Sequence, residues 1–216
     1  MPLYKNIVVS SATKIGIWKN TESENDLLAQ LILSDDEKIF ISSISNSERR
    51  HQWLCSRVCL RQLMSTNEFI ELLTDENGKP FVKNFPTHVS ISHTKEFAAV
   101  IISSENEVGI DIDKMLPRIE RIAHKFMRVE EKINVTEENK LHALYLYWCA
   151  KEVLYKYYGR KLLDFREHLF VKTFSEKPQG EILGEIKKGE VNFSLKINYQ
   201  TFDNHRLAWT EGKHVQ

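Results

Sequence analysis

The sequence predicts an α+β fold built from two similar halves, in each of which a small, mainly antiparallel sheet packs on helices. Two observations predict this fold. Segments with the two-residue alternation of strands occur in groups before and after segments with helical periodicity, instead of alternating with them one by one. The length of 216 residues also suits two domains of about 100 residues each. We set the boundary so that residues 1–104 form the first half and residues 105–216 the second.

The first half is predicted to begin with two short strands within residues 4–19. Two capping-box patterns follow at 21–24 and 34–37, where Thr or Ser precedes Glu by three positions. Each pattern predicts the start of a helix, and the first helix should carry the apolar residues of 27–32. A longer helix is predicted over 47–64, because apolar residues recur there at helical spacing.

Strands dominate after Gly78-Lys79-Pro80, which breaks the helical pattern. Alternation over 89–92, a nearly continuous apolar run over 97–102 and alternation over 108–113 predict three strands. Glu105-Asn106 is predicted to form the turn of a hairpin between the last two of these strands.

The second half is predicted to contain two helices followed by strands. The helices cover 119–133 and 137–158, and Gly159 ends the second because glycine readily adopts the left-handed conformation found after helices. Short apolar runs then predict strands at 170–171, 182–186, 191–197 and 207–209.

Composition excludes several classes of protein. The 30 Lys and Arg residues balance the 30 Asp and Glu residues, which argues against a protein that binds nucleic acid through bulk charge. No run approaches the roughly 18 apolar residues of a membrane-spanning helix, and the N-terminus lacks a signal-peptide pattern. The three cysteines have no C-x-x-C spacing, so we expect Cys55 and Cys59 to be core thiols and not a metal clasp. We therefore expect a cytoplasmic protein that binds neither nucleic acid nor membrane.

Asp111 and Asp113 interrupt an otherwise apolar predicted strand. Side chains alternate across a strand, so both carboxylates project from one face about 6 to 7 Å apart, opposite Val108, Ile110 and Ile112. Two like charges on a half-buried strand repel each other, and a shared hard cation such as Mg²⁺ relieves the repulsion. The alternative is that the pair ends an edge strand in solvent.

Glu152 and Lys156 lie four residues apart on the second predicted helix, in one stripe with Trp148. The stripe borders an aromatic and apolar surface, which puts both charges at the edge of a core. A third carboxylate beside Asp111 and Asp113, together with a lysine, supplies the parts of a magnesium–pyrophosphate site. The alternative is an exposed pair that stabilises the helix by a few tenths of a kcal/mol.

Further residues suit phosphate binding. Ser90, Ser92 and His93 end a predicted strand, where hydroxyl, imidazole and backbone N–H groups are available to phosphate oxygens. Four arginines, whose forked side chains match phosphate geometry, occur without an intervening acid, namely Arg49, Arg50, Arg57 and Arg61. The alternatives are a bystander histidine and the solvated face of an amphipathic helix.

Four motifs, in this order, resemble those of the 4′-phosphopantetheinyl transferase superfamily: Gly78-Lys79-Pro80, Ser90-Ile91-Ser92-His93-Thr94, Val108-Gly109-Ile110-Asp111-Ile112-Asp113 and Trp148-Cys149-Ala150-Lys151-Glu152-x-x-x-Lys156. The length and the two halves look like its surfactin-synthetase-activating (Sfp) type, a monomeric pseudo-dimer. The resemblance implies the fold of that superfamily and a Mg²⁺-dependent enzyme. Such an enzyme transfers the 4′-phosphopantetheine arm of coenzyme A (CoA) to a serine of an apo acyl or peptidyl carrier protein and releases adenosine 3′,5′-bisphosphate.

The resemblance also implies a metal site and a catalytic helix. Asp111, Asp113 and Glu152 would hold Mg²⁺, and Lys156 would contact the pyrophosphate as its bond breaks. Asp113 stands where the family commonly has glutamate, so its contact with the metal is either direct or bridged by water. Either Glu152 or a metal-bound water would take the serine proton.

A second set of residues is implied to bind CoA. Ser92 and His93 are similar to the family's phosphate-binding pair, with His93 near the 3′-phosphate. Lys79 and Pro80 resemble the loop on the adenine side. The basic residue for the 3′-phosphate is hypothesised to be Arg50, with the neighbouring histidine as an alternative. These residues place CoA binding mainly in the first half and the metal acids in the second.

Two other functions fit the same residues. A Mg²⁺-dependent pyrophosphate or phosphodiester hydrolase would use the same acids, and a CoA-binding or carrier-binding module would keep the ligand surface without catalysis. Retention of all three acids and Lys156 argues against the module. The sequence does not indicate which carrier protein or pathway is served.

Overall fold

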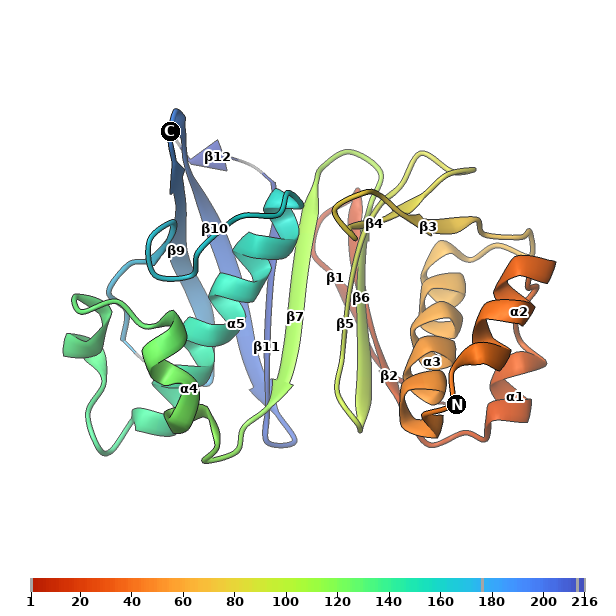
Figure 1. The fold of residues 1–216 in the computed structure, drawn as a ribbon, viewed down its shortest axis with the longest axis horizontal. Helices are drawn as coiled ribbons and strands as arrows, with labels where there is room; N and C mark the ends of the chain where they lie inside the picture. Colours follow the sequence, from red (N-terminus) through yellow and green to blue (C-terminus); the bar gives the residue numbers. More distant parts are fainter. Residues whose placement is uncertain (1, 176, 213, 216) are drawn as a thin grey trace.

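The structure, a computed structural model, describes residues 2–175, 177–212 and 214–215. It contains two antiparallel sheets packed against each other, with helices on the outer side of each (Figure 1). The predicted α+β class, with antiparallel sheets packed on helices, is confirmed. The chain passes from the first sheet to the second between Ser103 and Val108.

The first sheet has the strand order β1-β2-β6-β5, and α3 packs on β2 and β6. A separate two-stranded hairpin, β3–β4, lies next to β5. The elements of this part are β1 (Leu3–Val8), β2 (Thr13–Lys19), α1 (Glu24–Leu28), α2 (Asp35–Ser43), α3 (Ser47–Met64), β3 (Leu72–Thr74), β4 (Pro80–Val82), β5 (His88–His93) and β6 (Phe97–Ser103).

The second sheet has the strand order β7-β11-β10-β9-β8, and β12 also pairs with β10. Helix α5 crosses this sheet and packs mainly on β7 and β11 (Figure 1). The elements of this part are β7 (Val108–Lys114), α4 (Ile119–Phe126), the 3₁₀ helix η1 (Glu131–Asn134), α5 (Lys140–Tyr158), β8 (Leu169–Val171), β9 (Gln179–Lys188), β10 (Val191–Phe202), β11 (His205–Glu211) and β12 (His214–Val215).

Most predicted elements form where the local pattern puts them. Helix α3 covers the whole of the predicted range, and α5 ends at Tyr158 with Gly159 as a left-handed cap at φ 66°. Helix α2 begins at the predicted capping box, in which Ser34 and Glu37 exchange hydrogen bonds with each other's backbone N–H groups. The predicted strands of both halves are also present.

The face of β7 opposite the aspartates forms the core between the two sheets. Val108, Ile110 and Ile112 are buried against residues of the first sheet that include Ile15 and Ile17. The alternation predicted for this strand is therefore confirmed. Burial of three aliphatic side chains fixes the rotation of the strand, because a shift by one residue would turn the aspartates into this core.

The close packing of α5 on its sheet depends on two glycines. A Cβ atom at Gly109 of β7 would lie 2.5 Å from the carbonyl oxygen of Val153, and one at Gly212 would lie 2.6 Å from the ring of Tyr157. These contacts are shorter than van der Waals distance, so only glycine lets the helix approach this closely. The C-terminal half of α5 is thereby held against β7 and the residue that follows β11.

The first predicted helix is wrong in its start and its length. Helix α1 begins after Ser23, not at the predicted Thr21, because the Ser23 hydroxyl accepts the backbone N–H of Asp26. It has five residues and ends at Leu28, and the N–H groups of Gln30 and Leu31 then bond to carbonyls three residues back, which tightens the chain.

The predicted helix over 119–133 is also wrong in part. Helix α4 ends at Phe126, and the chain continues through an extended Met127 to the short helix η1. The cause is Glu131, whose carboxylate accepts the Arg128 N–H and pairs with Lys151 of α5 in the interior. This tertiary contact outweighs the local helical pattern.

The predicted hairpin between the strands at 97–102 and 108–113 does not form. Strand β6 pairs with β2 on one edge and β5 on the other, so it has no edge left for β7. Strand β7 instead pairs with β11 from the end of the chain. The predicted turn at Glu105-Asn106 lies in the passage between the two sheets.

None of the helices in the described part of the chain is long and apolar enough to span a membrane.

Candidate functional site

Strand β5 and helix α5, both distant in sequence from β7, each contribute a side chain that contacts Asp111 of β7. Two side chains donate hydrogen bonds to its Oδ1 atom, the Ser92 hydroxyl from β5 at 2.8 Å and the Lys156 ammonium from α5 at 2.8 Å. Lys156 also donates to the carbonyl oxygen of Ile110 at 3.0 Å. Three residues that the sequence singled out separately are therefore in direct contact.

The other oxygen of Asp111, Oδ2, is buried and has no hydrogen-bond partner among the described residues. A buried polar atom without a partner costs roughly 1–3 kcal/mol, and more when it belongs to a charged group. Carboxylate oxygens are the ligands that hard divalent cations prefer. The unpartnered oxygen is therefore suited to a cation such as Mg²⁺.

Glu152 and Asp113 add like charge close to Asp111. Burial and the charge of Asp111 raise the pKa of Glu152 to about 7, and the same two causes raise the pKa of Asp113. Arg118 lies 3.9 Å from Asp113 and opposes part of this effect. Mutual repulsion of three carboxylates is the electrostatic condition that a bound cation relieves.

The described residues contain no group of three acidic, histidine or cysteine side chains that already converges as a metal site. The Lys156 ammonium instead donates a hydrogen bond to Oδ1 of Asp111. The assignment of Asp111, Asp113 and Glu152 as magnesium ligands stays a prediction, which the donor chemistry and the unpartnered Oδ2 atom support.

Ser90 and His93 flank Ser92 on β5. The Ser90 hydroxyl accepts the backbone N–H of Ile110 at 3.2 Å, so β5 is held to β7 by two serines. The pKa of His93 is lowered by partial desolvation and by the nearby charges of Lys156 and Arg49. A neutral imidazole keeps one N–H donor for an anion.

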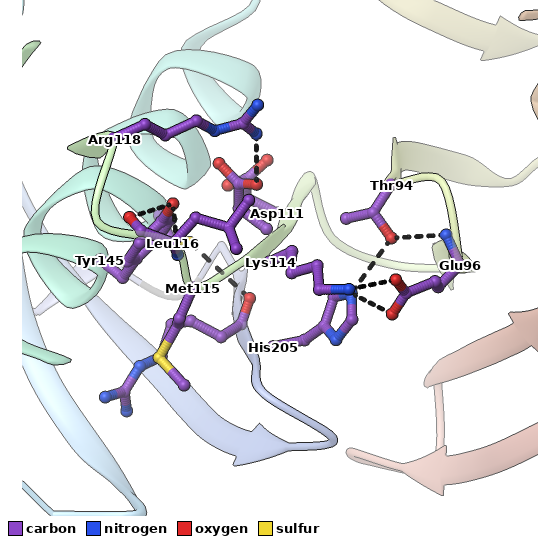
Figure 2. A network of polar contacts seen from close by, with 12 residues as sticks. Thr94, Glu96, Asp111, Lys114, Met115, Leu116, Arg118, Tyr145 and His205 are labelled. Carbon is purple, nitrogen blue, oxygen red and sulfur yellow. Dashed lines mark hydrogen bonds and ion pairs between the residues drawn. The ribbon is translucent and has the colours of Figure 1, made fainter. Parts of the chain in front are cut away.

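A second polar network fixes the turn that follows His93. Figure 2 shows the Glu96 carboxylate facing both Lys114 of β7 and the buried His205 of β11. Thr94 contacts the His205 ring at 3.4 Å and caps the turn by accepting the Phe97 N–H. The end of β5 is thus tied to the edge strand β7 of the other sheet and to its neighbour β11.

The four arginines of α3 differ in what they contact. Arg50 pairs with Glu24 at 2.7 Å and donates to the Ile44 carbonyl. Arg57 pairs with Glu37 and stacks on Trp53 at 3.3 Å, and Arg61 donates to the Glu68 carbonyl. The side chain of Arg49 has no hydrogen bond or ion pair within the described part of the chain. Arg49, and not the predicted Arg50, also lines a groove that contains His93.

Two cavities meet beside these residues. The smaller has a volume of about 180 Å³ and is lined from one half by Lys79, Pro80 and Ser90 and from the other by Lys156. The larger, about 640 Å³, runs from Pro80 to His93 along α2 and α3. Both are lined by Gly78, Pro80 and Ile91, so the two cavities adjoin, and we refer to them together as the cleft.

Lys79 lines the smaller cavity, but its ammonium is engaged elsewhere. It donates to Glu107 at 2.6 Å and to the Tyr157 carbonyl at the end of α5 at 3.0 Å. Its neighbour Pro80 lines both cavities. The predicted adenine-side pair therefore borders the cleft, while the charged group of Lys79 contacts the other half of the protein.

Sequence reasoning missed the role of Lys151. Its ammonium is fully buried and donates to Glu131 at 2.7 Å and to the carbonyls of Phe126 and Phe165. Trp148 packs on the same two aromatic rings and does not line either cavity. The signal available in the sequence was a lysine within the continuous apolar surface of the predicted helix.

Known protein families match both parts of the chain. A family model described as the 4′-phosphopantetheinyl transferase superfamily matches residues 107–210. A second, described as the 4′-phosphopantetheinyl transferase N-terminal domain, matches residues 36–103. The matched ranges contain every residue of the predicted site.

Three curated relatives illustrate the similarity. The 4′-phosphopantetheinyl transferase AcpT of Salmonella typhimurium is 30% identical over 55% of this chain and 64% of its own length. The holo-[acyl-carrier-protein] synthase of Staphylococcus carnosus is 30% identical over 40% of this chain and 85% of its own. The 4′-phosphopantetheinyl transferase Sfp of Bacillus subtilis is 26% identical over 82% of this chain and 85% of its own. The chain thus spans less than two thirds of the length of the AcpT relative.

Proposed function

The chain belongs to the 4′-phosphopantetheinyl transferase superfamily, and we propose that it transfers the 4′-phosphopantetheine arm of CoA to a serine of an apo acyl or peptidyl carrier protein. One observation carries the proposal beyond family membership. Ser92 and Lys156 both contact Asp111, Lys156 lines the smaller cavity, and Asp111 retains a buried oxygen without a partner among the described residues. A carboxylate suited to a cation beside a lysine is the arrangement that a pyrophosphate requires.

The reaction is a displacement at phosphorus. The serine oxygen of the carrier attacks the phosphorus that bears the pantetheine arm, and a new P–O bond forms as the bond to the adenosine-bearing phosphate breaks. Adenosine 3′,5′-bisphosphate leaves, and the serine proton is lost to a base. A magnesium ion held by Asp111, Asp113 and Glu152 would supply charge neutralisation for the pyrophosphate.

The residues of this chain have separate tasks in that reaction. Lys156 borders the cavity and neutralises charge on the leaving phosphate. Ser92 orients the Asp111 carboxylate by donating to Oδ1, and this leaves Oδ2 for the cation. Glu152, with its raised pKa, is the candidate among the three acids for accepting the serine proton.

The cleft is the proposed site for the rest of CoA. The adenine side is assigned to Lys79, which lines the smaller cavity, and to Pro80, which lines both, and the 3′-phosphate is assigned to His93 in the larger cavity. We assign Arg49 as the arginine of this phosphate site in preference to Arg50, whose guanidinium is paired with Glu24. Residues 1–104 then form the CoA adenine and 3′-phosphate half, and residues 105–216 the metal and catalytic half. The monomeric state and the cytoplasmic location stay predictions.

The proposal is tested by incubating the protein with CoA, Mg²⁺ and several apo acyl and peptidyl carrier proteins, followed by intact mass measurement. We expect one carrier at least to gain the mass of a phosphopantetheine group, and EDTA to prevent the gain until excess Mg²⁺ is added. No gain with any carrier, under conditions where a known transferase modifies all of them, would overturn the proposal. Breakdown of CoA without any carrier would identify a hydrolase instead, and CoA binding without turnover a binding module.

Arg49→Gln is expected to raise the KM for CoA by about 10- to 100-fold, because it removes a charge-assisted hydrogen bond to the 3′-phosphate. The KM for dephospho-CoA, which lacks that phosphate, should not change. Arg61→Gln, a change on the same helix outside the cleft, is the control. The measurement is the KM for dephospho-CoA divided by the KM for CoA. A fall of this ratio in Arg50→Gln but not in Arg49→Gln would contradict the assignment.

A further inference from the structure

Lys79 connects the two halves of the protein at the rim of the cleft. From the β3–β4 turn of the first half, its ammonium reaches Glu107, in the passage between the sheets, and the Tyr157 carbonyl near the end of α5. We call these two contacts the Lys79 tie. The carbonyls of the last helical turn have no partner within the helix, so Lys79 caps α5 from the opposite half.

The first end of the tie is anchored in a rigid turn. One oxygen of Asp75 accepts the backbone N–H groups of Asn77 and Lys79, at 2.8 and 2.9 Å. Backbone hydrogen bonds close the same turn between Asp75 and Lys79 and between Gly78 and Asp75. Gly78 has a φ of 87°, a conformation that favours glycine. The Cα position of Lys79 is therefore well determined.

The second end of the tie is anchored in the other half. The stem of Lys79 lies against Gly159, where an added Cβ would be 2.3 Å from the lysine Cδ. The Glu107 carbonyl accepts the backbone N–H of Gly212 in the second half, and its carboxylate also pairs with His88 of β5, in the first half, at 3.1 Å. The end of α5 is fixed to its own sheet through Gly109 and Gly212. The tie thus joins two bodies that are each rigid.

The smaller cavity lies between these two bodies. Lys79 and Gly78 line one side of it, and Gly159 and Lys156 line the other. Glu107 does not line it, although it holds the ammonium that joins both sides. A change at Glu107 therefore alters the separation of the cavity walls without removing a group that lines the cavity.

We propose that Glu107 and the side chain of Lys79 are positioning residues, which set the width of the CoA pocket by tying the β3–β4 turn to the end of α5. This inference rests on the proposed function for the identity of the ligand. It assigns the ammonium of Lys79 to the other half of the protein and leaves only the backbone of this residue and Pro80 for contact with CoA.

The two possible roles of Lys79 predict opposite signs for one substitution. CoA is an anion, so if Lys79 bound its phosphates, Glu107→Gln would remove a competing negative charge and tighten CoA binding. If Lys79 and Glu107 act as a tie, Glu107→Gln loosens the pocket and weakens CoA binding. The same substitution therefore separates direct contact from positioning.

The experiment compares wild type, Glu107→Gln, Lys79→Met and the double variant, by steady-state kinetics at saturating carrier and by calorimetric titration of CoA. Methionine keeps the apolar stem on Gly159 and removes the ammonium. We expect each single variant to raise the KM and Kd for CoA about three- to tenfold with kcat within about twofold of wild type. The double variant should not exceed the larger single effect, because both changes break one tie.

Glu181→Gln is the matched control, since Glu181 pairs with Lys196 at 3.1 Å on the far sheet and is 46% exposed, against 47% for Glu107. Its KM for CoA should equal that of wild type. Unchanged or tighter CoA binding in Glu107→Gln, or additive effects in the double variant, would overturn the tie.

Failure of the proposed function has a different signature. If the wild type does not bind CoA, that function is wrong, and hydrogen exchange of the amides of Asn77 and Lys79 still tests the tie. We expect both amides to exchange faster in Glu107→Gln than in wild type, because the turn loses its contact with α5. Equal exchange rates would overturn the tie whatever the ligand is.

Discussion

Glu152→Gln is expected to lower kcat for phosphopantetheine transfer by about 10²- to 10⁴-fold, the range that a group active in proton transfer supplies. The substitution keeps the size of the side chain and removes the charge proposed to hold the metal and accept the proton. The measurement is single-turnover mass gain of an apo carrier at saturating CoA and Mg²⁺. Glu137→Gln, an exposed change just before the same helix, is the matched control and should leave the rate unchanged.

The same variant should not lose stability. The pKa of Glu152 is raised from an ordinary value of 4.5 to about 7, mainly by burial and by Asp111. The folded protein therefore binds a proton at Glu152 more tightly than the unfolded chain, and the wild type loses stability as the pH rises from about 4.5 to 7. Glutamine has no such penalty. Without divalent cations, the Tm of Glu152→Gln relative to wild type should rise across that window and stay level above it.

A drop in Tm as large as that of a core truncation would show that Glu152 is a structural residue and not a functional one. Transfer at the wild-type rate would show that Glu152 neither holds the metal nor accepts the serine proton. A structural role and a functional role can be distinguished because the rate and the Tm are measured on the same variant.

Lys151→Met is expected to destabilise the protein by about 3–5 kcal/mol, the cost of leaving one partner of a buried ion pair without the other. Lys151 is fully buried, and its partner Glu131 is 4% exposed. Without the ammonium, the Glu131 carboxylate and two backbone carbonyls lose a donor in the interior. Chemical denaturation gives the free energy of unfolding directly.

A second substitution tests the cause of that loss. Glu131→Gln in the Lys151→Met background removes the unpaired charge, but its single amide oxygen replaces only one of the two carboxylate oxygens that accept the backbone N–H groups of Arg128 and Val171. The double variant should still be more stable than Lys151→Met alone, because an unpaired buried charge costs more than one lost hydrogen bond. Lys140→Met, which breaks exposed pairs at the start of the same helix, should cost less than about 1 kcal/mol. If both lysine variants cost the same, burial of the pair is not the cause.

The chemistry of the candidate site could be predicted from local patterns because those patterns place side chains on faces. Alternation in β7 put Asp111 opposite the aliphatic residues, and helical spacing put Glu152 and Lys156 on one side of α5. The contact between Lys156 and Asp111 was not predicted as a distance, since it depends on how closely α5 approaches β7. Gly109 permits that approach, and its role is visible only beside the carbonyl of Val153.

The partners of long charged side chains were less predictable. Arg49 and Arg50 are neighbours in an arginine-rich segment, yet one is paired with Glu24 of another helix and the other lines the groove. Lys79 sits in a family-like motif, but its ammonium contacts Glu107 and Tyr157. A long, flexible side chain bonds to acceptors that the fold places within its reach, and a sequence motif does not show which acceptors these are.

Local sequence patterns predict the class of fold, the family, most helices and strands, and the candidate acids and bases of the site, because periodicity, capping and motif order act over short stretches of chain. The tertiary structure was required to show that β7 pairs with β11 and not with β6, that Glu131 ends α4 early, and which cations line the groove. Each of these depends on edges, burial and charge supplied by residues far away in the chain.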